Sequence, residues 1–251
     1  MTCFTPPSLP RPGSLRRVLT FGLATACAAV GLSAPAEAQV HVSNNRYVHR
    51  LAEVDFNLHH GELTGTQPYA FFVEVLGTAI TYKKTRLPVF ADLNLAGGKI
   101  YPWKHASLYN GSNLNDGGKK PLYVHPELVA ANTPLTVKAV SYIKQGRYWN
   151  LLMTANTAHR SPQVIVLKNG DPAPQIGGFD GQADASSYVS DYIENGRMKL
   201  HVNQAIYLFE LGTDKLNSSS ADFQDLVVMV TLAESVEAIE EAIKGEPVDF
   251  D

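Results

Sequence analysis

The sequence predicts an all-β protein, an antiparallel β-sandwich of jelly-roll-like architecture with one or two short helices. Apolar and polar residues alternate along several runs; between Leu87 and Leu95 the odd-numbered positions are apolar, as in a half-buried strand. Most runs are bounded by Gly, Pro, Asn or Asp, which favour turns. No strand–helix–strand repeat of the kind that builds parallel sheets occurs, so neighbouring strands are expected to be antiparallel.

The predicted strands share this alternation or are continuously apolar, and they occupy residues 69–81, 87–95, 135–143, 148–156, 163–168, 205–211 and 223–232. Residues 144–147 separate two of these runs and predict a hairpin loop. The Asn169-Gly170 pair favours the positive φ of a tight turn.

Helix is expected only at 183–193 and at 233–244, where Val236, Ile239 and Ile243 recur at helical spacing and Gly245 follows as a stop signal. Residues 101–134 and 171–184 are predicted to be long loops. Loops of that length in a compact domain are functional or mobile.

The N-terminal 38 residues have the organisation of a secretory signal peptide. Arg16 and Arg17 precede an apolar stretch from Val18 to Leu32, and Ala36-Glu37-Ala38 supplies small residues around a cleavage site. A twin-arginine signal and lipid attachment at Cys27 are alternatives to ordinary cleavage. The mature protein is therefore expected to be secreted or periplasmic, without a membrane span.

Residues 39–232 are predicted to form a single β-sandwich domain, followed by a short helix and acidic tail at 233–251. Cys3 and Cys27 are the only cysteines, so the mature chain would contain no thiol. Disulfides, cysteine-ligated zinc and cysteine nucleophiles are then excluded.

Charge is unevenly distributed. Residues 39–232 contain 17 Lys or Arg and 16 Asp or Glu, whereas residues 233–251 contain seven acids and one lysine. The main body therefore lacks the strong basic excess of a nucleic-acid-binding domain.

Three acidic residues form the candidate metal site. If strands 205–211 and 223–232 pair as a hairpin, Glu210 comes near Asp222 and Asp225. Crowded carboxylates need a compensating cation or hydrogen-bond donors, and calcium accepts six to eight oxygen ligands in flexible geometry. The alternative is that Asp222 caps the turn through backbone N–H groups while Glu210 and Asp225 pair with Lys or Arg.

The same segment resembles a known group. The Phe209-Glu210 pair, followed by Asp-Phe-Gln-Asp-Leu-Val-Val at 222–228, is similar to the Asp-Phe-Asn-Asp-Leu-Val-Val signature of exported bacterial β-sandwich proteins of unknown function. The resemblance covers about 25 residues and implies export, a sandwich fold and calcium binding. Gln224 stands where that group usually has Asn, and residues 219–221 replace an additional acid or Gly-Asp.

Aromatic residues of the first long loop are candidate ligand-binding residues. Tyr101, Trp103 and Tyr109 could stack on the faces of a cell-surface glycan, or could instead fold back over the core. The His59-His60 pair could bind copper or zinc with His41 or His49, although no metalloenzyme spacing supports this.

No complete catalytic motif is present, so no catalytic residue is assigned. The sequence lacks Gly-x-Ser-x-Gly and His-Glu-x-x-His. We expect a non-enzymatic binding or structural module of the cell envelope, with a glycan or an envelope protein as partner. The alternative is a carbohydrate-binding module or a carbohydrate-active enzyme with two of Glu74, Glu210, Asp222 and Asp225 as paired carboxylates.

Overall fold

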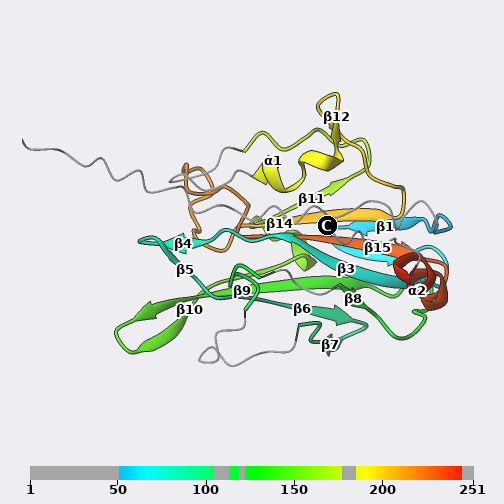
Figure 1. Ribbon diagram of the computed structural model, residues 1–251, viewed down its shortest axis with the longest axis horizontal. Helices are drawn as coiled ribbons and strands as arrows, with labels where there is room; N and C mark the ends of the chain where they lie inside the picture. Colours follow the sequence, from blue (N-terminus) through cyan, green and yellow to red (C-terminus); the bar gives the residue numbers. More distant parts are fainter. Residues whose placement is uncertain (1–50, 104–112, 119–121, 177–184, 245–251) are drawn as a thin grey trace, which may run out of the picture. The chain divides into compact units, whose positions relative to one another are not determined.

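The computed structural model describes residues 51–103, 113–118, 122–176 and 185–244 (Figure 1). These residues all lie in one compact unit, Pro35–Asp251. The predicted signal peptide at 1–38, Tyr109 and the acidic tail beyond Lys244 lie outside the described residues.

The first of two main sheets has six strands and is antiparallel throughout. Five strands follow the order β1-β2-β9-β6-β7, and β10 also pairs with β9. Their bounds are β1 Phe56–His59, β2 Glu62–Gly65, β6 Val89–Leu95, β7 Gly98–Ile100, β9 Leu135–Gln145 and β10 Tyr148–Asn156.

The second main sheet has five strands in the order β11-β14-β15-β3-β8, again antiparallel. Their bounds are β3 Ala70–Gly77, β8 Tyr123–Val124, β11 Val164–Lys168, β14 Gln204–Phe209 and β15 Leu226–Ala233. Two small hairpins complete the strands: β4 Thr81–Tyr82 with β5 Thr85–Arg86, and β12 Ile193–Glu194 with β13 Arg197–Met198.

One hydrophobic core joins the two main sheets. Alternate residues of β6 and β9 from the six-stranded sheet and of β3, β14 and β15 from the five-stranded sheet belong to a single buried cluster. It includes Val89, Val137, Val73, Tyr207 and Val228. The predicted all-β sandwich is therefore confirmed.

The five-stranded sheet is also covered on its other face, which explains why β14 and β15 are apolar at nearly every position. Ile206, Leu208 and Met229 pack there against Tyr188 and Tyr192 from the segment that follows residue 184. Every residue of β14 and β15 is buried. Such strands lose the alternation of a one-sided sheet and become continuously hydrophobic.

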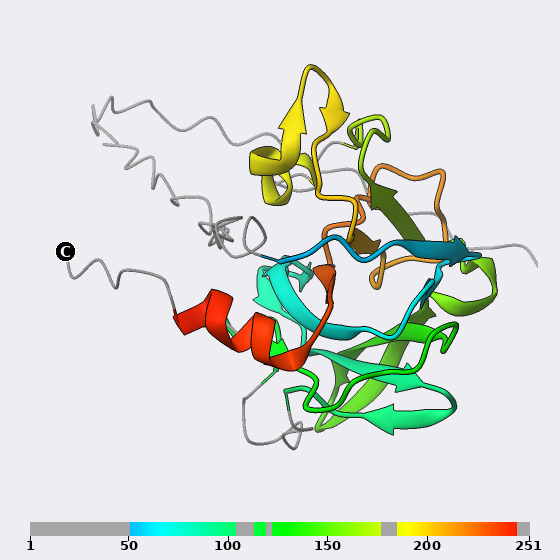
Figure 2. The ribbon, with the colours of Figure 1, turned by 90° about the vertical axis from the view of Figure 1, so that its right-hand side faces the viewer.

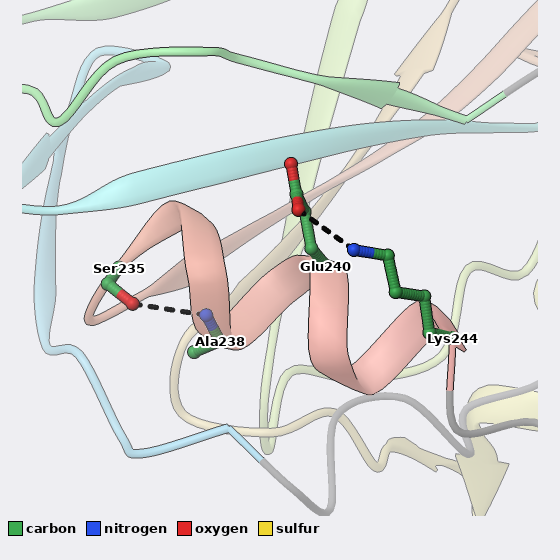
Figure 3. A network of polar contacts seen from close by, with 4 residues as sticks. All are labelled: Ser235, Ala238, Glu240 and Lys244. Atoms are coloured by element: carbon green, nitrogen blue, oxygen red, sulfur yellow. Dashed lines mark hydrogen bonds and ion pairs between the residues drawn. The ribbon is translucent and has the colours of Figure 1, made fainter.

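The C-terminal helix is shorter than predicted. It spans Val236–Lys244 (α2), because Ala233 still pairs with Ala70 as the last residue of β15. Ser235 Oγ accepts a hydrogen bond from Ala238 N at 3.1 Å, and Lys244 Nζ contacts Glu240 Oε2 at 3.1 Å (Figure 3). This N-cap and this i,i+4 pair stabilise the two ends of the helix.

The helix lies alongside β3 (Figure 2). Ile239 and Ala242 pack on Phe72 and Ala70, on the face of β3 that points away from the sandwich core. Burial of this amphipathic face explains how a short helix is held in place.

The prediction of one helix at 183–193 is only partly correct, because the described residues form two short helical turns. The described part of this segment forms a single turn, α1 Ala185–Tyr188, then a 3₁₀ turn, η3 Ser190–Tyr192, and then enters β12. Residues 183 and 184 lie outside the described part. Packing of Tyr188, Val189 and Tyr192 on the sheet fixes this segment, and the two aromatic residues and the β-branched Val189 give little helical propensity.

Two of the long predicted strands are also corrected. The run 69–81 is divided into β3 and β4, with residues 78–80 outside both strands. The run 223–232 begins as a strand only at Leu226, because Phe223 has a φ of +52°, which no β-strand accommodates. Strands β1 and β2 were not predicted, since their apolar residues are few and the hairpin is short.

Candidate functional site

The structure brings Glu210, Asp222 and Asp225 together, and we call these three residues the acidic clasp. Glu210 directly follows β14 and Asp225 directly precedes β15; these strands pair through Phe209 and Leu226. The side chains are buried, with exposed fractions of 0% for Glu210, 3% for Asp222 and 4% for Asp225. The carboxylates therefore lie near one another, as the hairpin pairing predicts, and they lie inside the protein.

Glu210 binds both sides of the loop that joins β14 to β15. Its Oε1 accepts hydrogen bonds from Gly212 N at 2.9 Å and Thr213 N at 3.0 Å. Its Oε2 accepts hydrogen bonds from Asp222 N at 3.0 Å and Phe223 N at 3.3 Å. One carboxylate thus satisfies four backbone donors and fastens the two ends of the loop to each other.

These bonds account for the unusual backbone of Phe223. A φ of +52° is a sterically unfavourable conformation for a bulky residue. Because the carboxylate of Glu210 accepts the N–H of Phe223, the loop can hold this conformation. The hydrogen bonds to a charged acceptor are stronger than neutral ones and offset the strain.

Asp225 contributes a fifth backbone contact and a link to Glu210. Its Oδ2 accepts a hydrogen bond from Leu211 N, and a side-chain hydrogen bond joins it to Glu210. Burial raises the pKa of Asp225 well above its ordinary value, and the adjacent Glu210 charge raises it further, while the Leu211 N–H acts in the opposite direction. A hydrogen bond between two carboxyl groups requires a proton, so the pair retains one where ordinary carboxyls are ionised.

Gln224 completes the clasp and was not recognised from the sequence. Its Nε2 donates a hydrogen bond to Asp222 Oδ2 at 2.8 Å, and the side chain is fully buried. The amide therefore supplies a donor for the third carboxylate, that of Asp222, for which backbone N–H groups were predicted. Its position between two acids was the available sign of this role.

The surroundings of the clasp are closely packed. A Cβ atom at Gly212 would lie 3.3 Å from Glu210 Oε1 and 3.4 Å from Asp225 Oδ2. The phenol of Tyr188, whose pKa burial raises to about 12, lies within electrostatic range of Arg86 and of the two aspartates. Ser141 Oγ donates a hydrogen bond to the carbonyl of Leu211 at 2.6 Å, which ties the loop to β9.

The backbone N–H donors around these carboxylates disfavour a bound cation. Backbone N–H groups point at Glu210 and Asp225, and a calcium ion needs those oxygens as ligands and cannot use N–H groups. Within the described ranges, no group of three or more His, Cys, Asp or Glu has metal-binding geometry. Calcium at Glu210, Asp222 and Asp225 stays a prediction, which the melting experiment below tests.

Tyr101 and Trp103, two of the three predicted ligand-binding aromatic residues, differ in exposure. Tyr101 is 48% exposed and is available to a ligand. Trp103 is half-buried and packs against the main core cluster. Trp103 therefore has the core-covering role that the sequence left open as an alternative, and Tyr109 lies outside the described residues.

His59 is the last residue of β1 and His60 is in the turn to β2, and their ring centroids are 3.9 Å apart. His60 and Gly61 line a pocket of about 280 Å³ together with Arg160 and neighbouring residues. Gly61 is required there, because a Cβ would lie 2.1 Å from the carbonyl oxygen of Thr157 and its φ is +94°. His41 and His49, the proposed additional metal ligands, lie outside the described residues.

Glu74, a candidate for a catalytic carboxylate pair, is on β3. Its neighbours Val73 and Val75 face the core between the sheets, so Glu74 is on the opposite face of the strand.

No helix in the described part of the chain combines the length and apolar character needed to cross a membrane. Comparison of the chain with protein-family models, with curated proteins and with solved structures finds no match.

Proposed function

We propose that this chain is an exported, non-enzymatic binding or structural module of the cell envelope, in which the acidic clasp serves stability. The observation that carries the proposal is the carboxylate of Glu210, which is buried and bound by four backbone N–H groups. A carboxylate used in this way closes a loop. Its exposed fraction is 0%, so it does not present its oxygens to solvent.

A carbohydrate-active enzyme is the less favoured alternative. Glycoside hydrolysis needs two carboxyl groups that flank an accessible bond, one as acid and one as base or nucleophile. Glu210 and Asp225 are paired with each other and covered by the loop. Burial raises the pKa of Asp225, and burial perturbs the pKa of structural carboxyl groups as well as catalytic ones.

A polysaccharide assay tests the proposal. We expect no release of reducing ends from neutral or acidic polysaccharides, at any pH where the protein is folded. Hydrolysis that is lost in Asp225→Asn, with melting temperature retained, would instead assign the clasp to catalysis. Retention on a polysaccharide gel that is lost in Tyr101→Ala would identify a glycan partner; Tyr101 is preferred to Trp103 because its exposed ring contributes less to the core.

Calcium binding is a second candidate because Glu210, Asp222 and Asp225 lie together. We expect equal melting midpoints, within about 1 °C, in millimolar calcium and in chelator, because backbone donors already occupy the oxygens. An ion at 100 times its dissociation constant would add about 2.7 kcal/mol, which raises the midpoint by roughly 5–10 °C. A rise of that size, absent in Asp225→Asn, would establish calcium in place of the proton.

A further inference from the structure

The turn between β4 and β5 has an unfavourable backbone and a high positive charge. Tyr82 pairs with Thr85, so Lys83 and Lys84 form a two-residue turn, and their φ values are +50° and +64°. Turns of this kind strongly prefer Asn-Gly, because left-handed backbone is unfavourable for longer side chains. Lysine at both positions therefore opposes local stability.

The other hairpins in the described structure with two positive-φ turn residues show what this turn lacks. They place glycine at the second turn position, with Gly61 between β1 and β2, Gly97 between β6 and β7, and Gly196 between β12 and β13. Only the turn at Lys83–Lys84 has no glycine among these described hairpins. Unfavourable backbone that persists in this way is frequently associated with function.

A second hairpin places more positive charge at the same end of the sandwich. Val89, at the start of β6, pairs with Ser141, and Tyr142 N donates a hydrogen bond to Pro88 O at 3.1 Å. Strand β9 continues beyond this pair to its turn with β10. Arg147 is in this turn, and Lys144 is one residue before the end of β9. Both hairpin turns therefore project beyond the start of β6, as the left side of Figure 1 shows.

We call Lys83, Lys84, Arg86, Lys144 and Arg147 the basic end. All five side chains are exposed. Within the described ranges, the ion pairs Lys199–Glu194 and Lys244–Glu240 involve none of these five residues. Since residues 39–232 are nearly neutral as a whole, the positive charge here is a local concentration.

Exposed apolar side chains accompany these charges. Tyr82 is 49% exposed, Tyr148 70% and Leu151 57%. Lys83 Nζ lies 5.3 Å from the centroid of the Tyr82 ring. Tyrosine favours the boundary between water and lipid, and lysine places its apolar stem along lipid while its ammonium group meets phosphate.

We propose that the basic end docks the module on an anionic lipid surface, with the two turns as the points of contact. The turns are convex, so they suit a plane of phosphate groups better than a single sugar residue, which a concave site would enclose. Lysine is a compact charge with no directional requirement, as a disordered layer of headgroups demands. The proposal rests on the envelope role proposed above and names its partner.

Vesicle sedimentation tests this inference with the processed chain lacking residues 1–38, since the apolar stretch from Val18 to Leu32 would itself bind lipid. The described sandwich and its core lie entirely outside the removed segment. We expect binding to vesicles of phosphatidylcholine with 30% phosphatidylglycerol, weakening with salt, and little binding to phosphatidylcholine alone.

The decisive variant is Lys83→Asn with Lys84→Gly, which installs the same Asn-Gly pair as Asn195–Gly196. It should raise the melting temperature by about 2–4 °C, because glycine accepts the left-handed backbone. It should also weaken vesicle binding about 30-fold, the loss expected for two lysines near an anionic surface. A higher melting temperature together with weaker vesicle binding would show that the loss of binding does not result from unfolding.

The matched control removes the same charge elsewhere. Lys99 on β7 and Lys168 on β11 lie toward the other end of their sheets, opposite Asn94 and Ala205. Lys99→Gln with Lys168→Gln should change vesicle binding less than about 3-fold. Equal binding by wild type and the Asn-Gly variant would overturn the proposal, as would equal losses in both double variants.

Two further experiments identify the ligand of the basic end. Inorganic phosphate at an ionic strength matched with chloride should not displace the protein from vesicles; stronger displacement by phosphate would indicate a site for the free ion and contradict lipid docking. If the protein does not bind vesicles but is retained on an acidic polysaccharide gel in a lysine-dependent way, the ligand of the basic end is a polysaccharide and the lipid proposal is wrong. Failure of vesicle binding leaves the non-enzymatic role intact, because that role is tested by polysaccharide hydrolysis.

Discussion

Replacing Glu210 by glutamine should lower the free energy of unfolding by about 3 kcal/mol or more, although the two side chains have nearly the same shape. Glu210 accepts two N–H bonds on each carboxylate oxygen. In glutamine one oxygen becomes an NH₂ group, so in either orientation two backbone donors face another donor. Buried donors left unsatisfied cost about 1–3 kcal/mol each.

Urea unfolding of Glu210→Gln and of Asp225→Asn provides the comparison. The chemical change is the same, and both positions are buried. Asp225→Asn should not lower the free energy of unfolding at pH 6, since its oxygen can still accept from Leu211 N and its NH₂ group can donate to Glu210 in place of the proton. A loss below about 1 kcal/mol in Glu210→Gln would show that the four N–H bonds do not stabilise the loop.

Stability should fall as pH rises, and Asp225 should be the main cause. Burial raises the pKa of Asp225 in the folded protein above its unfolded value, so the folded state holds a proton that the unfolded state has lost. The stabilising effect is therefore complete below the unfolded pKa, near 4, and decreases as pH rises toward the folded pKa. One proton corresponds to about 1.4 kcal/mol per pH unit across that window.

The measurement is the free energy of unfolding of wild type and Asp225→Asn at pH 5, 6, 7 and 8. The difference between the two proteins separates the contribution of Asp225 from that of titrating groups elsewhere in the chain. The variant should become progressively more stable than wild type as pH rises. A constant difference across this range would mean that the carboxyl pair does not retain a proton.

Much of the fold followed from local patterns. In strands β6, β9 and β10, apolar and polar residues alternate or turn residues mark the strand ends. The hairpin loop predicted at 144–147 joins β9 to β10 in the structure. The pairing of β14 with β15, which brings Glu210 to Asp225, followed from two apolar runs separated by a polar loop. These features depend on contacts that are close in sequence.

The errors arose where distant packing decides the conformation. Residues 183–193 have some helical periodicity, but Tyr188 and Tyr192 are fixed by the outer face of the five-stranded sheet, so the segment ends in turns. The apolar pattern predicts a strand that begins at Phe223. In the structure the carboxylate of Glu210 accepts the N–H of Phe223, and this residue has a left-handed backbone. Neither the packing on the sheet nor the hydrogen bond to Glu210 can be predicted from the local pattern of residues.

The amino-acid sequence by itself determined the all-β class, the antiparallel pairing and the proximity of the three acids, because these follow from alternation, turn residues and neighbouring strands. Only the tertiary structure decided that the acids are buried, that backbone N–H groups compensate them, and that two hairpins with basic residues project from one end. Burial and hydrogen-bond partners depend on which sheets and loops meet in space, and residue spacing along the chain does not specify that.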